Sequence, residues 1–190
     1  MRAFLTSPVR ETRAPGSEMG QAGNRCSYLN GITQTNEKPR ATMYNIAKDC
    51  DTLHRNWKKT CGLLKREEYS MAIVRSATCA EIAANIMIRQ ELVTKRKLKI
   101  EFVDHLLVWA NGLHGKITKI MKPLLHGTAE WKAVQSVETK TRKLSEARNS
   151  IAHGGEFCAK DHAAEMVRNS HEICIAFVTP YSPDFELKKP

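Results

Sequence analysis

Residues 67–93 read EEYSMAIVRSATCAEIAANIMIRQELV, and this stretch decides the fold class. Apolar positions recur in it every four residues, the spacing that puts side chains on one face of an α-helix. Alanines flank this stripe, and small side chains allow a neighbouring helix to approach closely. The stretch therefore predicts a central helix packed among other helices. The stripe consists of Val74, Thr78, Ile82 and Ile86, and the flanking alanines are Ala77, Ala80 and Ala84.

The rest of the chain also favours helix. No proline occurs between Pro39 and Pro123 or between Pro123 and Pro180, and strand-like alternation is nowhere sustained. Thr128 is a candidate N-cap, and the glycine pair at 154–155 would end the helix that Thr128 begins. We expect an all-α fold, an antiparallel bundle of about five helices with short connections. The predicted helices span about residues 41–64, 67–93, 100–121, 128–153 and 159–178, and Phe102 is among the residues expected to face inward.

Composition divides the chain into three predicted parts. Residues 1–36 hold prolines and glycines without periodicity, which predicts a disordered leader. Residues 37–180 would form the bundle, and residues 181–190 a C-terminal tail. No run of about 18 apolar residues exists, so we expect no transmembrane helix and no membrane partner. The sparse cysteines form no CxxC pair, so we do not expect a disulfide framework. We expect a cytoplasmic location instead.

The charge of the chain favours an acidic partner. Lysine and arginine number 30 against 20 aspartates and glutamates, a formal net charge of +10 at pH 7. Such an excess promotes association with nucleic acid. A basic protein with a solvated surface and no such partner is the alternative.

Residues 146–157 read EARNSIAHGGEF and hold the candidate catalytic residues. Five residues rotate a helix by roughly 500°, so Arg148 and His153 would point about 140° apart on an unbroken helix. We therefore expect either a break near His153 or two chains that each contribute a pair. Asn149 lies four residues before His153, on the same face, and is placed to orient the imidazole.

Arginine and histidine suit metal-free chemistry on a phosphodiester. Histidine exchanges a proton near neutral pH, and the planar arginine fork matches phosphate. The alternative is structural, because the negative end of a helix attracts basic residues and glycine often follows as a cap. Cys158 and His162 are four residues apart, but no second pair completes a zinc set, so we expect neither a metal nor a cofactor.

Other side chains are weaker candidates. Glu81 could support Arg148 or His153, although a carboxylate at the edge of the core is the commoner role. The basic run at 94–99 could hold an RNA backbone or could be a solvated loop. His105 and His114 lie on the predicted third helix and carry no motif. The candidate RNA-binding residues are Lys140, Arg142 and Lys143, and Trp57, Trp109 and Trp131 are candidate core or dimer-interface residues, of which Trp131 could stack a base.

The string RNSIAHG from Arg148 to Gly154 resembles the signature of the HEPN superfamily, whose motif lies between the last two core helices of a helical bundle. The resemblance covers about residues 41–178. It implies a metal-independent endoribonuclease in a toxin–antitoxin or phage-defence setting, a homodimer with two motifs in one cleft, and an antitoxin or regulatory protein as a further partner. Arg148 would bind phosphate and His153 would act as general base or acid.

The same resemblance leaves other roles open. Some members of the superfamily are non-catalytic RNA-binding, nucleotide-binding or scaffold modules that act through a partner. A subgroup carries a tyrosine two residues after the histidine, where this chain has Gly155, so control through a modified tyrosine is not expected here. A basic helical protein that binds DNA or protein without any catalytic site is the third hypothesis.

Overall fold

The structure, a computed structural model, describes residues 44–190 and confirms the all-α class. Within these residues no strand is formed, and the predicted leader, residues 1–36, lies outside them. The helices are α1 (Ile46–Lys65), α2 (Tyr69–Arg89), α3 (Ile100–Trp109), α4 (Gly112–Lys116), α5 (Lys122–Leu125), α6 (Ala129–Ser136), α7 (Glu138–Gly154) and α8 (Lys160–Val178), and the π-helical segments are η1 (Gln90–Lys95) and η2 (Ile117–Met121).

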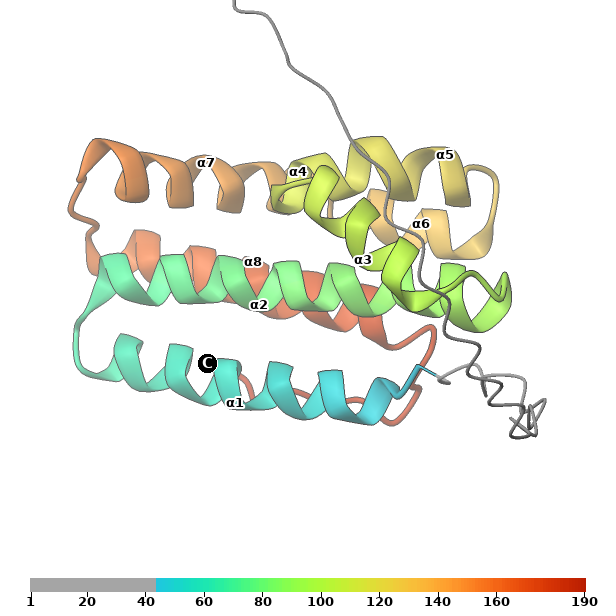
Figure 1. The fold of residues 1–190 in the computed structure, drawn as a ribbon. Coiled ribbons are helices and arrows are strands. Elements are labelled where there is room, and N and C mark those ends of the chain that lie inside the picture. The colour runs from blue at the N-terminus through green and yellow to red at the C-terminus, as the bar shows by residue number, and fades with distance from the viewer. Residues whose placement is uncertain (1–43) are drawn as a thin grey trace, which may run out of the picture. The chain divides into compact units, whose positions relative to one another are not determined.

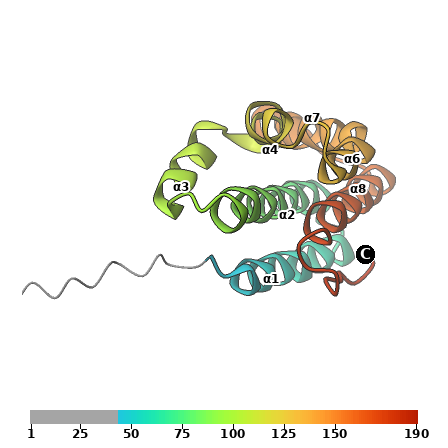
Figure 2. The ribbon, with the colours of Figure 1, turned by 90° about the vertical axis from the view of Figure 1, so that its right-hand side faces the viewer.

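Helix α2 lies at the centre of the bundle. Viewed along the helices, α2 is surrounded by α1, α8, α7 and α3 (Figure 2). The pairs α1/α2 and α7/α8 each run antiparallel, as predicted (Figure 1). The stripe predicted from the sequence is only half-buried at Val74, Thr78 and Ile82, because the most buried face of α2 lies nearly on the opposite side of the helix. This buried face is rich in alanine and contains Ala72, Ile73, Ser76, Ala80, Ala83 and Met87, all 0% exposed.

The segment of α2 and η1 is long and apolar enough to cross a membrane by length and composition alone. The expectation that no such segment exists is therefore corrected. In this fold the apolar surface of α2 packs against α1, α7 and α8, and 61% of its most apolar window is buried. A core helix of a bundle has this character, because it is surrounded by other helices.

Two of the predicted helices are interrupted. The one expected over residues 100–121 ends at Trp109, and a turn through Ala110 leads to Gly112, whose φ of +72° favours glycine. The next is broken at Val137, so Thr128 caps α6 by accepting from the backbone N–H of Trp131 at 3.3 Å, and α7 begins afterwards. Phe102, expected to face inward, is 52% exposed.

The predicted tail, residues 181–190, packs against the bundle instead of leaving it. Phe185 and Leu187 are each 6% exposed. The indole Nε1 of Trp57 on α1 donates to the carbonyl of Lys188 at 2.7 Å. Residues 181–190 thus contribute side chains to the hydrophobic core.

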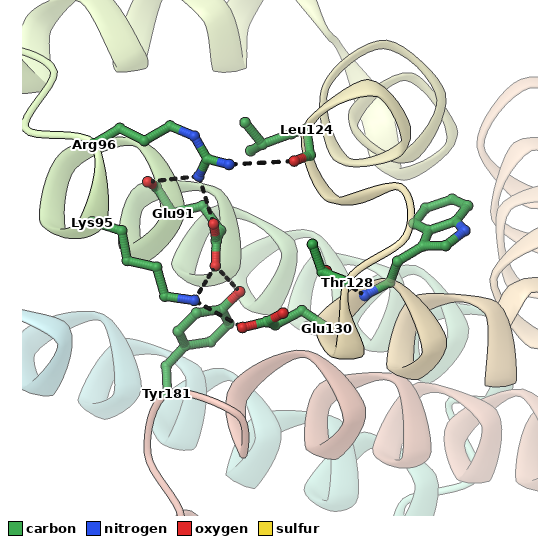
Figure 3. A network of polar contacts seen from close by, with 8 residues as sticks. Glu91, Lys95, Arg96, Leu124, Thr128, Glu130 and Tyr181 are labelled. Carbon is green, nitrogen blue, oxygen red and sulfur yellow. Dashed lines mark hydrogen bonds and ion pairs between the residues drawn. The ribbon is translucent and has the colours of Figure 1, made fainter.

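A buried carboxylate links η1 to α6 and to the segment after α8 (Figure 3). Glu91 is 3% exposed and accepts from Lys95 and Arg96 at 2.6 Å each and from the hydroxyl of Tyr181 at 2.8 Å. Lys95 also reaches Glu130 on α6 at 2.8 Å. Burial raises the pKa of Glu91, but these hydrogen bonds outweigh burial, so its pKa lies below the ordinary value.

We expect Glu91→Gln to lower the free energy of unfolding at pH 7 by about 2–3 kcal/mol, because an amide cannot satisfy two cations and a hydroxyl, while the half-exposed cations can regain water. A folded-state pKa below the unfolded one stabilises the fold above the unfolded pKa of about 4.3, and this contribution disappears as the pH falls through the folded value. Urea unfolding at pH 7 and pH 3 should therefore show a difference between the two proteins that shrinks in acid.

The matched control is Glu101→Gln, at an exposed position in the first turn of α3. It should change stability by less than about 0.5 kcal/mol. An equal loss for both variants, or a Glu91 effect that grows in acid, would contradict the role assigned to the buried carboxylate.

The adjacent glycines at the end of α7 should respond oppositely to alanine. Gly155 adopts φ +67° and its N–H donates to the carbonyl of Ile151, whereas Gly154 is still helical and open around its Cα. Gly155→Ala should cost about 1–2 kcal/mol, since left-handed backbone disfavours a Cβ. Gly154→Ala should be neutral or stabilise by up to about 1 kcal/mol. Thermal denaturation of both variants tests this, and a stable Gly155→Ala protein would disprove the cap.

Candidate functional site

The motif lies in a surface cleft of about 590 Å³ between α2, α7 and the segment that begins with α4. Helix α7 contributes Arg148, Asn149 and His153, α2 contributes Glu81, and the third side contributes His114 and Lys119. Both the predicted catalytic residues and the predicted supporting carboxylate therefore line one cleft.

Arg148 and His153 converge within one chain. The Nη1 atom of Arg148 lies 3.5 Å from Nε2 of His153, and α7 continues unbroken to Gly154. The expectation that the pair requires a helix break or a second chain is therefore wrong. Helix geometry fixes the directions in which the two side chains leave the backbone, but the arginine side chain is long and has enough rotatable bonds to reach round the helix.

Asn149 contacts the arginine rather than the histidine. Its Oδ1 accepts from Nη1 of Arg148 at 3.0 Å. We predicted that Asn149 orients the imidazole, and the structure instead shows it holding the guanidinium. Nη1 of Arg148 thus lies close to both the amide oxygen of Asn149 and the ring nitrogen of His153. The other N–H groups of the guanidinium can donate to an anion.

Glu81 reaches the cleft from the central helix. It lies one turn after Ala77, which also lines the cleft, so that α2 presents a small side chain and then a half-buried carboxylate to α7. Among the cleft-lining residues of the described part of the chain, Glu81 is the single acidic one. Lys116 on α4 lies behind this wall, 5% exposed, and burial lowers its pKa against the opposing effect of Glu81.

The third wall was missed by sequence reasoning. His114 and Lys119 were read as parts of one continuous third helix, yet the turn at residues 110–112 redirects the chain, and both residues line the cleft together with residues of α7. The usable signal was the string NGLHG at 111–115, since glycines that weaken a predicted helix mark a place where the chain can turn. Lys119 also lies over the ring of the exposed Trp109, with Nζ 4.8 Å from the ring centroid.

The predicted RNA-binding residues lie elsewhere. Lys140 pairs with Glu172, and Lys143 pairs with Glu165 at 3.1 Å, both on α8. Arg142 lies 3.8 Å from Glu146 on its own helix. Lys140 and Lys143 are on the side of α7 that turns away from the cleft, because positions 143 and 145 are separated by about 200°. Arg142 is on the same side of the helix as Asn149 but is not among the residues that line the cleft. The structure does not bring the three predicted residues together with Arg148 and His153.

The remaining candidates have structural surroundings. In the basic run, Lys95 and Arg96 belong to the Glu91 network. Trp57 and Trp131 are 3% and 8% exposed, so Trp131 is not available to stack a base, while Trp109 is 60% exposed. Over residues 44–190, no group of three or more histidine, cysteine or acidic side chains is arranged to hold a metal ion.

No family model, no curated protein and no solved structure matches the chain. The resemblance to the HEPN superfamily therefore rests on the residues of the motif and on its place at the C-terminal end of α7, before α8.

Proposed function

We propose that this chain is a metal-independent endoribonuclease that cleaves RNA through attack of a 2′-hydroxyl on the adjacent phosphate. The observation that supports the proposal is the convergence of Arg148 and His153, 3.5 Å apart, in a surface cleft that is also lined by Glu81. A permanent cation beside an imidazole is the pair that phosphodiester transesterification requires.

The reaction assigns a distinct task to each group. His153 accepts the proton of the 2′-hydroxyl as this oxygen bonds to phosphorus. Arg148 donates hydrogen bonds to the phosphoryl oxygens, on which negative charge increases as the bond forms. Asn149 restricts the guanidinium through its 3.0 Å contact. Cleavage of the bond to the 5′-oxygen leaves a 2′,3′-cyclic phosphate and a 5′-hydroxyl.

A specific contact favours a second candidate, a non-catalytic RNA- or nucleotide-binding module. Nε2 of His153 accepts a hydrogen bond from Arg148, and a general base needs that lone pair free. If the contact persists when phosphate is bound, the cleft binds RNA without cutting it. In the proposed enzyme the phosphate draws the guanidinium away and frees the imidazole.

The setting and the assembly extend the proposal. The resemblance of the motif supports a toxin–antitoxin or phage-defence role in the cytoplasm, with a regulatory protein as partner. It also supports a homodimer, for which the apolar surface of α3 is a suitable contact region. Phe102, Val108 and Trp109 are between 52% and 77% exposed there. Sedimentation of the purified chain measures this assembly.

We expect the purified chain to cleave RNA in the presence of EDTA, and Arg148→Ala and His153→Ala each to lower the rate at least about 100-fold, the usual loss when a proton-transfer or charge-stabilising group is removed. Gel analysis of a 5′-labelled RNA, with detection of cyclic phosphate ends, measures both the rate and the chemistry. Induced expression should arrest growth, and His153→Ala should relieve the arrest.

Matched controls come from exposed residues of the same types. Arg142→Ala on α7 and His162→Ala on α8 remove the same groups outside the cleft and should keep wild-type activity. Equal cleavage by all four variants would reveal a contaminating nuclease. RNA binding that depends on Arg148 without any cleavage would establish the binding module instead.

Lys119→Ala should weaken RNA binding more than Lys140→Ala. Within residues 44–190 Lys119 lines the cleft without a carboxylate partner, whereas the charge of Lys140 is paired with Glu172. Loss of one phosphate contact lowers the slope of log affinity against log salt by about 1. Fluorescence anisotropy at several salt concentrations measures this slope, and a larger effect at Lys140 would move the RNA path to the α8 side.

A further inference from the structure

We infer that His114 is a second proton-transfer residue, acting as the general acid that protonates the 5′-oxygen, so that one chain carries both imidazoles of the reaction. This inference rests on the proposed endoribonuclease function and adds to it a residue that carries no sequence motif. The observation behind it is that His114 on α4 and His153 on α7 line the same cleft, with Arg148 beside His153.

The chemistry requires a proton at each end of the displacement. The bond from the 2′-oxygen to phosphorus forms while the bond from phosphorus to the 5′-oxygen breaks, so one proton leaves the nucleophile and another must reach the leaving alkoxide. His153 takes the first proton. A separate, protonated imidazole supplies the second, and solvent then restores both histidines to their starting states.

The contact of His153 with Arg148 assigns the two roles. Arginine is always protonated, so Nη1 can only donate, and Nε2 of His153 can accept only in the neutral imidazole. A neutral imidazole is the form that a base needs. The acid must then come from elsewhere in the cleft, and His114 is the other imidazole that lines it.

The fold holds His114 at this wall. The turn at Ala110 and Gly112 ends α3 and starts α4, and Leu113, the neighbour of His114, is 4% exposed and anchors α4 in the core. The carbonyl of His114 accepts from the hydroxyl of Thr118 at 2.9 Å. The backbone is thereby fixed while the exposed imidazole remains free to meet a substrate.

The charged groups around the cleft come from every element that borders it. Glu81 on α2 contributes the negative charge, and Lys116, Lys119 and Arg148 contribute positive charge from α4, η2 and α7. Positive charges attract the phosphate backbone.

The test compares two substrates that differ in one atom. The first is an RNA oligonucleotide that contains a linkage the wild-type chain cleaves. The second carries sulfur in place of the bridging 5′-oxygen at that linkage, and a thiolate leaves without being protonated. We expect His114→Asn to lower the rate at least about 100-fold on the oxygen substrate and less than about threefold on the sulfur substrate. His153→Asn should lower the rate on both.

The pH profile gives an independent readout. The wild type should show a bell-shaped dependence on pH, with the acidic limb from the base and the alkaline limb from the acid. His114→Asn should remove the alkaline limb and keep the acidic one. The matched control His105→Asn, at an exposed position on α3 outside the cleft, should leave rates and profile unchanged.

The outcomes separate this inference from the proposed function. If His114→Asn lowers the cleavage rate equally on both substrates, His114 has a structural role and the inference is overturned. If the variant cleaves the oxygen substrate at the wild-type rate, the inference is also overturned, and a composite site from two chains is indicated. Cleavage that survives His153→Asn and Arg148→Ala would instead overturn the proposed function. Activity of His114→Asn on the sulfur substrate shows at the same time that the variant folds.

Discussion

The close approach of neighbouring helices to the alanine-rich face of α2 is the constraint on which the rest of the structure depends. Ala72, Ala80 and Ala83 are completely buried, so α1 and α8 can pack tightly against the backbone of α2. With these faces occupied, the side that carries Ala77 and Glu81 is left for α7 and α4. The position of the cleft is thus a consequence of how the central helix is packed.

The cleft combines local and distant contributions. Arg148, Asn149 and His153 are near one another in sequence, and their mutual contacts at 3.0 and 3.5 Å need only the register of α7 and the reach of an arginine side chain. Glu81 and His114 come from other elements. In a site of this kind the local motif supplies the reacting groups, and the helical bundle supplies the side chains around them. Different substitutions therefore test the motif and its surroundings.

Polar contacts also explain why net charge was a poor guide to individual residues. Lys140 and Lys143 looked like phosphate contacts because they precede the motif, but both reach carboxylates on α8. Lys95 and Arg96 looked like a basic loop, yet they surround Glu91, which is buried. Acidic partners distant in sequence decide whether a cation is free to meet RNA, and composition does not contain that information.

Local rules account for what the sequence alone determined. The helical class, the cap at Thr128 and the left-handed glycine at 155 follow from residues a few positions apart. Tertiary structure decided the rest. It selected the buried face of α2, packed residues 181–190 against the bundle and placed His114 in the same cleft as His153, because each of these depends on contacts between segments far apart in the chain.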